Sequence, residues 1–261
     1  MRDKKSSVWF TAGLIITYVL MIAVNALANI LPINGQTTGE ISDKYGNLFA
    51  PAGFTFAVWS VIYVLLALHV LYQLGLFQKK HRSALLHPIG IYFCTSSVLN
   101  ALWILTWHYE RLLLSVLIML GMLVILIKIN KLTHEHGLSR REVFFVRIPF
   151  SVYFGWITIA TIANITAYLV SIDWDGFGLA EVTWTIMILL TGAAIGILAI
   201  LRLKDIAYGL VLIWAYYGIY SKHISISGFH GEYPAIITTI LICLALIALS
   251  IVFIAFKKIR N

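Results

Sequence analysis

Eight long apolar runs constrain the fold of this chain more than any other feature of its sequence. They lie at about 8–31, 54–76, 89–107, 112–129, 149–170, 182–201, 206–220 and 235–256. A helix needs roughly 20 mostly apolar residues to cross about 30 Å of hydrocarbon, whereas a membrane barrel shows alternating segments of about 10 residues. The runs therefore predict an all-α fold, a polytopic transmembrane helical bundle with about eight spans.

The composition of the chain agrees with a membrane location. Hydrophobic residues make up 61% of the chain and charged residues 11%, whereas a soluble domain averages about 25% charged residues. So few charges cannot cover a water-soluble surface, and we expect the lipid bilayer to be a partner. The net charge of +8 could suggest nucleic acid, but the basic residues flank the apolar runs and do not form a basic face. We therefore expect no nucleic-acid partner.

The distribution of Lys and Arg predicts the orientation of the chain. If all eight runs span, sixteen of the 19 basic residues fall on one side, and only Lys44, Arg111 and Lys222 fall on the other. Because basic residues concentrate in cytoplasmic loops, we expect a multi-pass plasma-membrane protein with both termini in the cytoplasm. The seventh run, 206–220, is the shortest and is rich in tyrosine, so it could instead lie in the membrane interface. Without it the last basic residues would lie outside.

The beginning of the chain could also be a cleaved signal peptide. It has a basic start and an Ala26-Leu27-Ala28 end. However, the apolar stretch is longer than the usual 7–15 residues of a signal peptide. We expect this segment to remain as the first span.

The membrane portion lacks the groups that most chemistry needs. His69 is the only ionisable group well inside a run, and we expect it to have a structural, hydrogen-bonded role. Metalloprotease, phosphate-loop and nucleophile-elbow motifs do not occur, and the two cysteines lie in apolar runs. The sequence thus predicts no enzyme, no catalytic residue, no metal site and no obligatory cofactor, and it disfavours a proton pump or ion symporter.

Aromatic and carboxamide side chains recur at helical spacing inside three of the runs. These are Trp59 with Tyr63, Asn100 with Trp103, and Trp156 with Ala160 and Asn164. Residues three or four apart share a helical face, so three helices could point indoles and amides at one cavity.

A structural role for the same residues is also open. A buried Asn in a membrane commonly ties two helices together. A Trp commonly anchors a helix at the lipid interface, and Trp9, Trp107 and Trp174 fit that description because they lie at or beyond run ends. Spacing alone favours the structural role.

Three segments of the chain resemble the TspO/translocator protein family, also called tryptophan-rich sensory proteins or peripheral-type benzodiazepine receptors. The first, 51–63, is similar to the entry of the family's second helix, with Val-Trp and a later Tyr. The second has the family's Asn-x-x-Trp at Asn100 and Trp103, followed by Arg111. The third, 156–164, has Trp, then Ala-Thr, then Asn, as in the fifth helix. The resemblance covers roughly residues 8–170.

This resemblance implies an architecture and a class of ligand. It implies a TspO-like five-helix bundle at 1–170, extended by three further helices at 171–261. It also implies a hydrophobic pocket for flat apolar molecules such as porphyrins. The chain departs from the family pattern at Ala52, which replaces a proline, and at Met119, where an acid is common. A basic residue is also missing after Tyr168, so the family's sterol-recognition pattern is broken there.

The sequence therefore predicts a non-enzymatic membrane protein that binds a small hydrophobic, planar, porphyrin-like ligand for sensing, signalling or transport. The predicted ligand-binding residues are Trp59, Tyr63, Asn100, Trp103, Trp156, Ala160 and Asn164. A second copy of the chain is a candidate partner in a homodimer. The alternative is a carrier or permease subunit for a neutral solute, which would need an aqueous path across the whole bundle.

Overall fold

The computed structural model describes residues 2–78 and 83–260, and every regular element in these ranges is helical. The chain folds into two compact units. Unit 1 comprises Met1–Thr38 and Trp59–Phe150, and unit 2 comprises Gly39–Val58 and Ser151–Asn261. Three basic residues that the orientation argument uses, Lys79, Lys80 and Arg82, lie outside the described residues.

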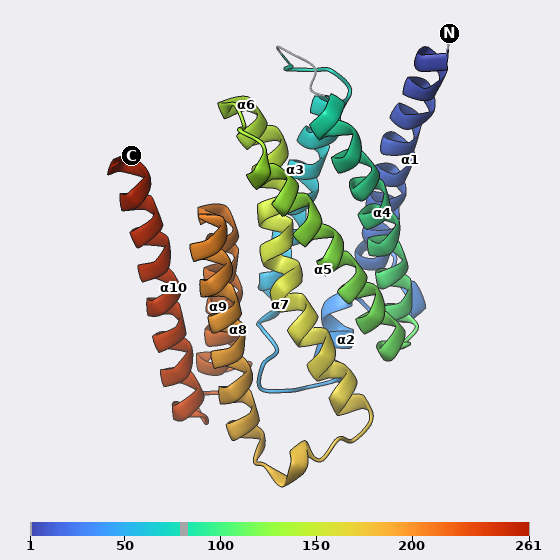
Figure 1. Cartoon of the computed structure of the whole chain (residues 1–261). Helices are drawn as coiled ribbons and strands as arrows, with labels where there is room; N and C mark the ends of the chain where they lie inside the picture. Colours follow the sequence, from blue (N-terminus) through green and yellow to red (C-terminus); the bar gives the residue numbers. More distant parts are fainter. Residues whose placement is uncertain (1, 79–82, 261) are drawn as a thin grey trace. The chain divides into compact units, whose positions relative to one another are not determined.

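Unit 1 is built around a long central helix. Its elements are α1 (Arg2–Ile30), the short η1 (Ile33–Gly35), all but the first residue of α3 (Val58–Gln73), α4 (Ser83–His108), α5 (Leu112–Glu135), α6 (Arg140–Glu142) and the π-helical turn η3 (Val143–Arg147). Helix α4 packs against α1 on one side and α5 on the other (Figure 1). Both of those neighbours keep many apolar side chains exposed, as expected for helices that face lipid.

Unit 2 combines the segment Gly39–Val58, which we call the covering segment, with four long helices. Its elements are α2 (Thr38–Lys44) from its second residue on, η2 (Gly53–Ala57), α7 (Ile148–Ser171) from Ser151 on, η4 (Gly176–Gly178), α8 (Glu181–Leu203), α9 (Ile206–Ile224) and α10 (Pro234–Arg260). Helix α10 packs along both α8 and α9, and the three run side by side in Figure 1. The segment η2 packs against α9.

The prediction of a polytopic all-α bundle is confirmed, with one difference in the number of spans. Seven segments of the described chain are long and apolar enough to cross a membrane. They are Val8–Ile30, Gly53–Gln73, Ala84–His108, Leu112–Glu135, Arg140–Ser171, Glu181–Leu203 and Pro234–Lys257. The remaining predicted run forms the 19-residue helix α9, which is not among them. Its four tyrosines and its last turn, with Lys222 and His223, make it less apolar.

One of the buried histidines of unit 1, His69, has the hydrogen-bonded role that the sequence predicts. His69 is completely buried, and its Nδ1 atom donates to the Phe145 carbonyl at 3.0 Å. The Gln73 side chain lies 3.3 Å from His69 Nε2 and also donates to the Leu86 carbonyl at 2.9 Å. A neutral imidazole satisfies this pattern, with one nitrogen donating and the other accepting. His69 thus joins α3 to the π-helical turn η3.

Candidate functional site

In unit 1 the predicted aromatic residues come together in a row of neighbouring rings. Trp59 and Tyr63 stack with ring centroids 5.5 Å apart, and Trp59 lies 5.8 Å from Trp103. Trp103 in turn stacks on Trp107 at 6.1 Å. We call these four residues, three tryptophans and Tyr63, the indole row. It joins α3 to α4, and it exists because each helix carries two aromatic residues four positions apart on one face.

The position of Trp107 corrects one sequence interpretation. We expected this residue to anchor a helix end at the lipid interface, but its side chain is only 5% exposed and extends the indole row. Its Nε1 atom donates to the Thr38 carbonyl at 3.2 Å. Trp9, in contrast, is 76% exposed, in agreement with an anchor that faces lipid. The spacing of Trp103 and Trp107, four residues apart, is the signal that could have placed Trp107 in the row.

The fourth predicted residue of unit 1, Asn100, is completely buried beside α1. Its Oδ1 atom accepts a hydrogen bond of 2.7 Å from the Nδ2 atom of Asn25, which also donates to the Met21 carbonyl at 2.9 Å. An amide pair of this kind satisfies polar groups that hydrocarbon would leave unpaired. This contact favours a structural contribution from Asn100.

In unit 2 the predicted residues lie along one face of α7. Trp156 and Asn164 are both buried, and Ala160 between them is partly exposed. The indole of Trp156 meets the ring of Phe56, in η2, edge to face at 6.0 Å. The predicted residues therefore form two sets, one in each unit. The convergence of Trp59, Trp103 and Trp156 on one cavity stays a prediction.

The covering segment of unit 2 is held by α9. The backbone N–H of Ala52 donates to the Gly218 carbonyl at 3.0 Å, and the Trp214 indole donates to the Thr55 carbonyl at 2.9 Å. His223 is buried and donates from Nε2 to the Leu48 carbonyl at 2.8 Å. These bonds order a segment that composition alone could equally assign to a solvated loop.

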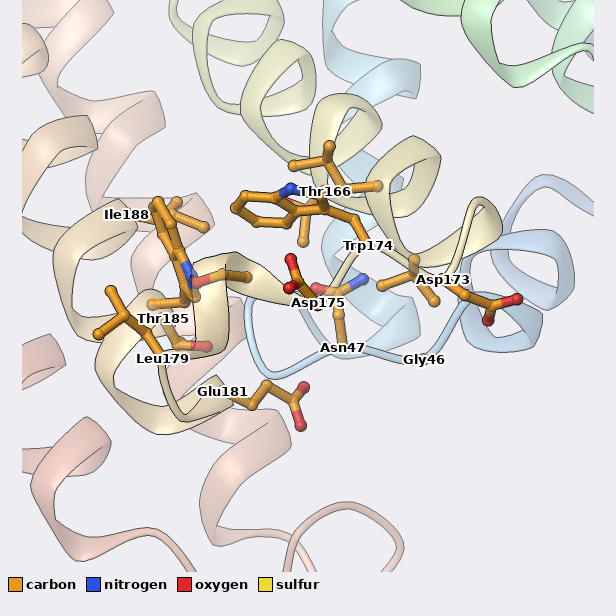
Figure 2. A pocket seen from close by; sticks show the side chains of 14 residues that line it. Gly46, Asn47, Thr166, Asp173, Trp174, Asp175, Leu179, Glu181, Thr185 and Ile188 are labelled. Carbon is orange, nitrogen blue, oxygen red and sulfur yellow. Dashed lines mark hydrogen bonds between the residues drawn. The ribbon is translucent and has the colours of Figure 1, made fainter.

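Unit 2 also contains a pocket that the sequence interpretation missed. It has a volume of about 480 Å³ and is lined by the end of α7, the connection that follows it, the beginning of α8 and the covering segment (Figure 2). Two indoles, Trp174 and Trp184, and three acidic side chains contribute to it. We expected Trp174 only as an interface anchor. The sequence signal was the Asp-Trp-Asp triplet at 173–175, followed by a second Trp early in α8.

The described residues are also not arranged to hold a metal. No group of three or more His, Cys, Asp or Glu side chains in 2–78 and 83–260 could coordinate an ion.

The apolar helices define an integral, multi-pass α-helical membrane protein. A family model described as TSPO-like protein matches residues 9–253, so the chain belongs to the TSPO-like family. The match continues through α8, α9 and most of α10, and thus includes the helices that we expected as an extension of a five-helix bundle. Membership suggests a membrane protein that binds hydrophobic ligands, in a family that is generally non-enzymatic. No curated protein and no solved structure matches the chain.

Proposed function

We propose that this chain is a non-enzymatic membrane protein that binds a flat, hydrophobic, porphyrin-like ligand for sensing, signalling or transport. The observation that carries the proposal is the indole row of unit 1, in which Trp59, Trp103 and Trp107 are 9%, 4% and 5% exposed. Ligand pockets are lined mostly by apolar and aromatic side chains, with few polar groups that fix orientation. A row of indoles suits a planar aromatic ligand because such rings favour offset stacking and edge-to-face contacts.

The proposed binding residues include one further set of side chains on α7. These are Trp156, Ala160 and Asn164, which supply an indole, a small residue and a buried amide on the same helical face. The amide is the group that could bind a polar edge of the ligand, because an amide both donates and accepts hydrogen bonds. In unit 1 we propose Trp59, Tyr63 and Trp103 as ring contacts, with Asn100 beside them.

A porphyrin titration tests this proposal. Purified protein in nanodiscs is titrated with protoporphyrin IX, and quenching of tryptophan fluorescence gives the dissociation constant for the wild type and for Trp59→Leu, Trp103→Leu and Trp156→Leu. Each lost aromatic contact is worth about 0.5–1.5 kcal/mol, so we expect each dissociation constant to rise roughly 2- to 10-fold.

The matched control is Trp9→Leu, which removes one indole that is exposed and outside both sets. It should leave the dissociation constant unchanged. If the wild type does not bind protoporphyrin IX, the ligand class is wrong. If all three variants bind as the wild type does, the residue assignment is wrong.

We also propose a plasma-membrane location with both termini in the cytoplasm. The support is the segregation of sixteen of the 19 basic residues to one side when α9 is counted as a span. Both the covering segment and the connection between α7 and α8 then lie on the non-cytoplasmic side.

A further inference from the structure

The pocket between α7 and α8 differs in charge from the rest of the molecule. Three acidic side chains, Asp173, Asp175 and Glu181, line it, and none of its fourteen lining residues is Lys or Arg. The whole chain, in contrast, carries a net charge of +8. A local excess of negative charge in a concave surface concentrates cations there.

Two neighbouring indoles form part of the wall of this pocket. Trp174 and Trp184 lie with ring centroids 4.9 Å apart, and the Trp184 indole donates to the Gly176 carbonyl at 2.5 Å. That glycine is required, because its φ is +64° and a Cβ there would lie 2.7 Å from the Trp184 ring. Indole faces attract cations through the ring quadrupole and pack against methylene groups.

The acidic groups do not gather on one point. Figure 2 shows Asp173, Asp175 and Glu181 at separate places around the pocket. In agreement, the described part of the chain holds no group of carboxylates arranged for a metal ion. A compact divalent ion could therefore not contact all three carboxylates, whereas an elongated molecule with several separated positive charges could.

We propose that this pocket binds an aliphatic polyamine from the non-cytoplasmic side. Its ammonium groups would pair with the separated carboxylates, and its methylene stem would lie against Trp174 and Trp184. The volume of about 480 Å³ is within the usual range for small-molecule sites, about 300–1,000 Å³. The lining comes from 46–47 and 166–188, two parts of the chain that face the same side in the proposed topology.

Titration calorimetry with spermidine tests the site. The full chain is placed in nanodiscs of phosphatidylcholine alone, because anionic lipids themselves attract polyamines. The test variant is Asp173→Asn/Asp175→Asn/Glu181→Gln, which removes charge and keeps size. Asn at 175 also keeps an acceptor for the Phe177 N–H, which Asp175 caps at 3.1 Å.

The matched control is Glu232→Gln, an exposed acid of the same unit that does not line the pocket. Exposed ion pairs contribute about 0.2–1 kcal/mol each, so the triple variant should bind spermidine roughly 3- to 100-fold more weakly, and the control should bind as the wild type does. Butylamine, with one charge, should bind more weakly than spermidine, and 1,6-hexanediol, with none, should not compete.

Three results would overturn the proposal. They are undetectable spermidine binding to the wild type, equal binding to the triple variant, and displacement of spermidine by equimolar Mg²⁺, which would indicate a metal site. Porphyrin quenching is measured on the same samples and should not change in the triple variant. A failure of the polyamine site is therefore distinguishable from a failure of the proposed function.

Discussion

The Nδ2 atom of Asn25 lies 2.7 Å from the Oδ1 atom of Asn100, and both side chains are buried where α1 meets α4. Neither amide could be left unpaired in hydrocarbon without cost. The pair thus fixes one crossing point of two helices, and it does so beside the indole row, because Asn100 precedes Trp103 by three residues on α4.

Replacing Asn100 should weaken the fold more than it weakens ligand binding. Intramembrane hydrogen bonds average about 0.6 kcal/mol, with a maximum near 1.7 kcal/mol. Asn100→Ala should therefore lower the free energy of unfolding by an amount between these two values. Unfolding in mixed micelles measures it. Asn25→Ala should have a similar effect, and the double variant should cost less than the sum. Additive costs would mean that the amides are not coupled, and a large loss of porphyrin affinity at unchanged stability would make Asn100 a ligand contact.

Replacing Asn164 should weaken ligand binding more than it weakens the fold. This buried amide shares a face of α7 with Trp156 and Ala160. If it binds a polar group of the ligand, Asn164→Ala leaves that group unpaired at a cost of about 1–3 kcal/mol, or roughly 5- to 150-fold in affinity. Porphyrin titration of the folded variant measures the effect. Asn29→Ala, an exposed amide on α1, serves as the control. Unchanged affinity in Asn164→Ala would limit this residue to packing.

Close packing of α7 against α9 makes Gly155 intolerant of a larger side chain. A Cβ at this position would lie 2.9 Å from the Tyr208 carbonyl oxygen and 3.0 Å from the Val211 Cβ, so a backbone would have to move. Overpacking of this kind costs about 1–3 kcal/mol, and we expect Gly155→Ala to lose that much stability. A Cβ at Gly13 would meet no atom of the described residues within 4 Å, so Gly13→Ala should instead gain up to about 1 kcal/mol, because Ala favours helix. Relative to the wild type, the midpoint temperature of thermal unfolding should fall for Gly155→Ala and rise for Gly13→Ala.

The stability of unit 2 should fall in mild acid because of His223. This residue lies beyond the apolar part of α9, and burial lowers its pKa below the ordinary 6.5, although the hydrogen bond to Leu48 acts in the other direction. Its Nδ1 atom is buried and has no hydrogen-bond partner among the described residues. Below about pH 6.5 the unfolded chain takes up a proton more readily than the folded chain does, so this contribution to stability is full above that pH and is lost as the pH decreases.

Unfolding measured from pH 8 to pH 5 tests this contribution. The difference in slope between the wild type and His223→Gln isolates it from the other seven histidines, and it should reach at most about 1.4 kcal/mol per pH unit. Equal slopes would mean that His223 can be protonated without leaving its contacts.

The long helices could be predicted from the sequence because hydrocarbon thickness and hydrophobic run length determine them. Their ends could not, since polar turns can extend a helix beyond its apolar run. The fifth predicted run begins at 149, but helical structure begins at Arg140, where Ser139 forms a capping box with Glu142. Spacing also placed Trp59 with Tyr63 correctly on one face.

Partners far apart in the chain are the part that spacing could not supply. The bond between Asn25 and Asn100, and the bonds from α9 to the covering segment, depend on how helices meet in three dimensions. The pocket at the end of α7 was missed for the same reason, because its lining comes from segments more than a hundred residues apart.

The packing of α9 supports the proposal that it crosses the membrane despite its lower hydropathy. At about 1.5 Å per residue the 19-residue helix is roughly 28 Å long, which is close to the hydrocarbon thickness, and its last turn, with Lys222 and His223, lies at the membrane surface beyond the apolar part when α9 crosses. Tyr208 and Tyr216 are completely buried, and their hydroxyls donate to Thr158 at 3.2 Å and to the Leu189 carbonyl at 2.6 Å. A helix whose polar groups are satisfied by its protein neighbours needs less apolar surface to lie in a membrane.

Reporter fusions at the ends of the C-terminal helices test whether α9 spans. A reporter after Arg141 and one after Lys204 should both read cytoplasmic. Helices α7 and α8 cross the membrane out and back between these two positions, and α9 comes after both, so its crossing does not affect either signal. A reporter after Arg260 follows α9 and α10. It should read cytoplasmic if both helices cross, and non-cytoplasmic if α10 crosses alone. We expect a cytoplasmic signal, because only this arrangement keeps Lys257, Lys258 and Arg260 with the other basic residues. A non-cytoplasmic signal at Arg260 would remove α9 from the spans.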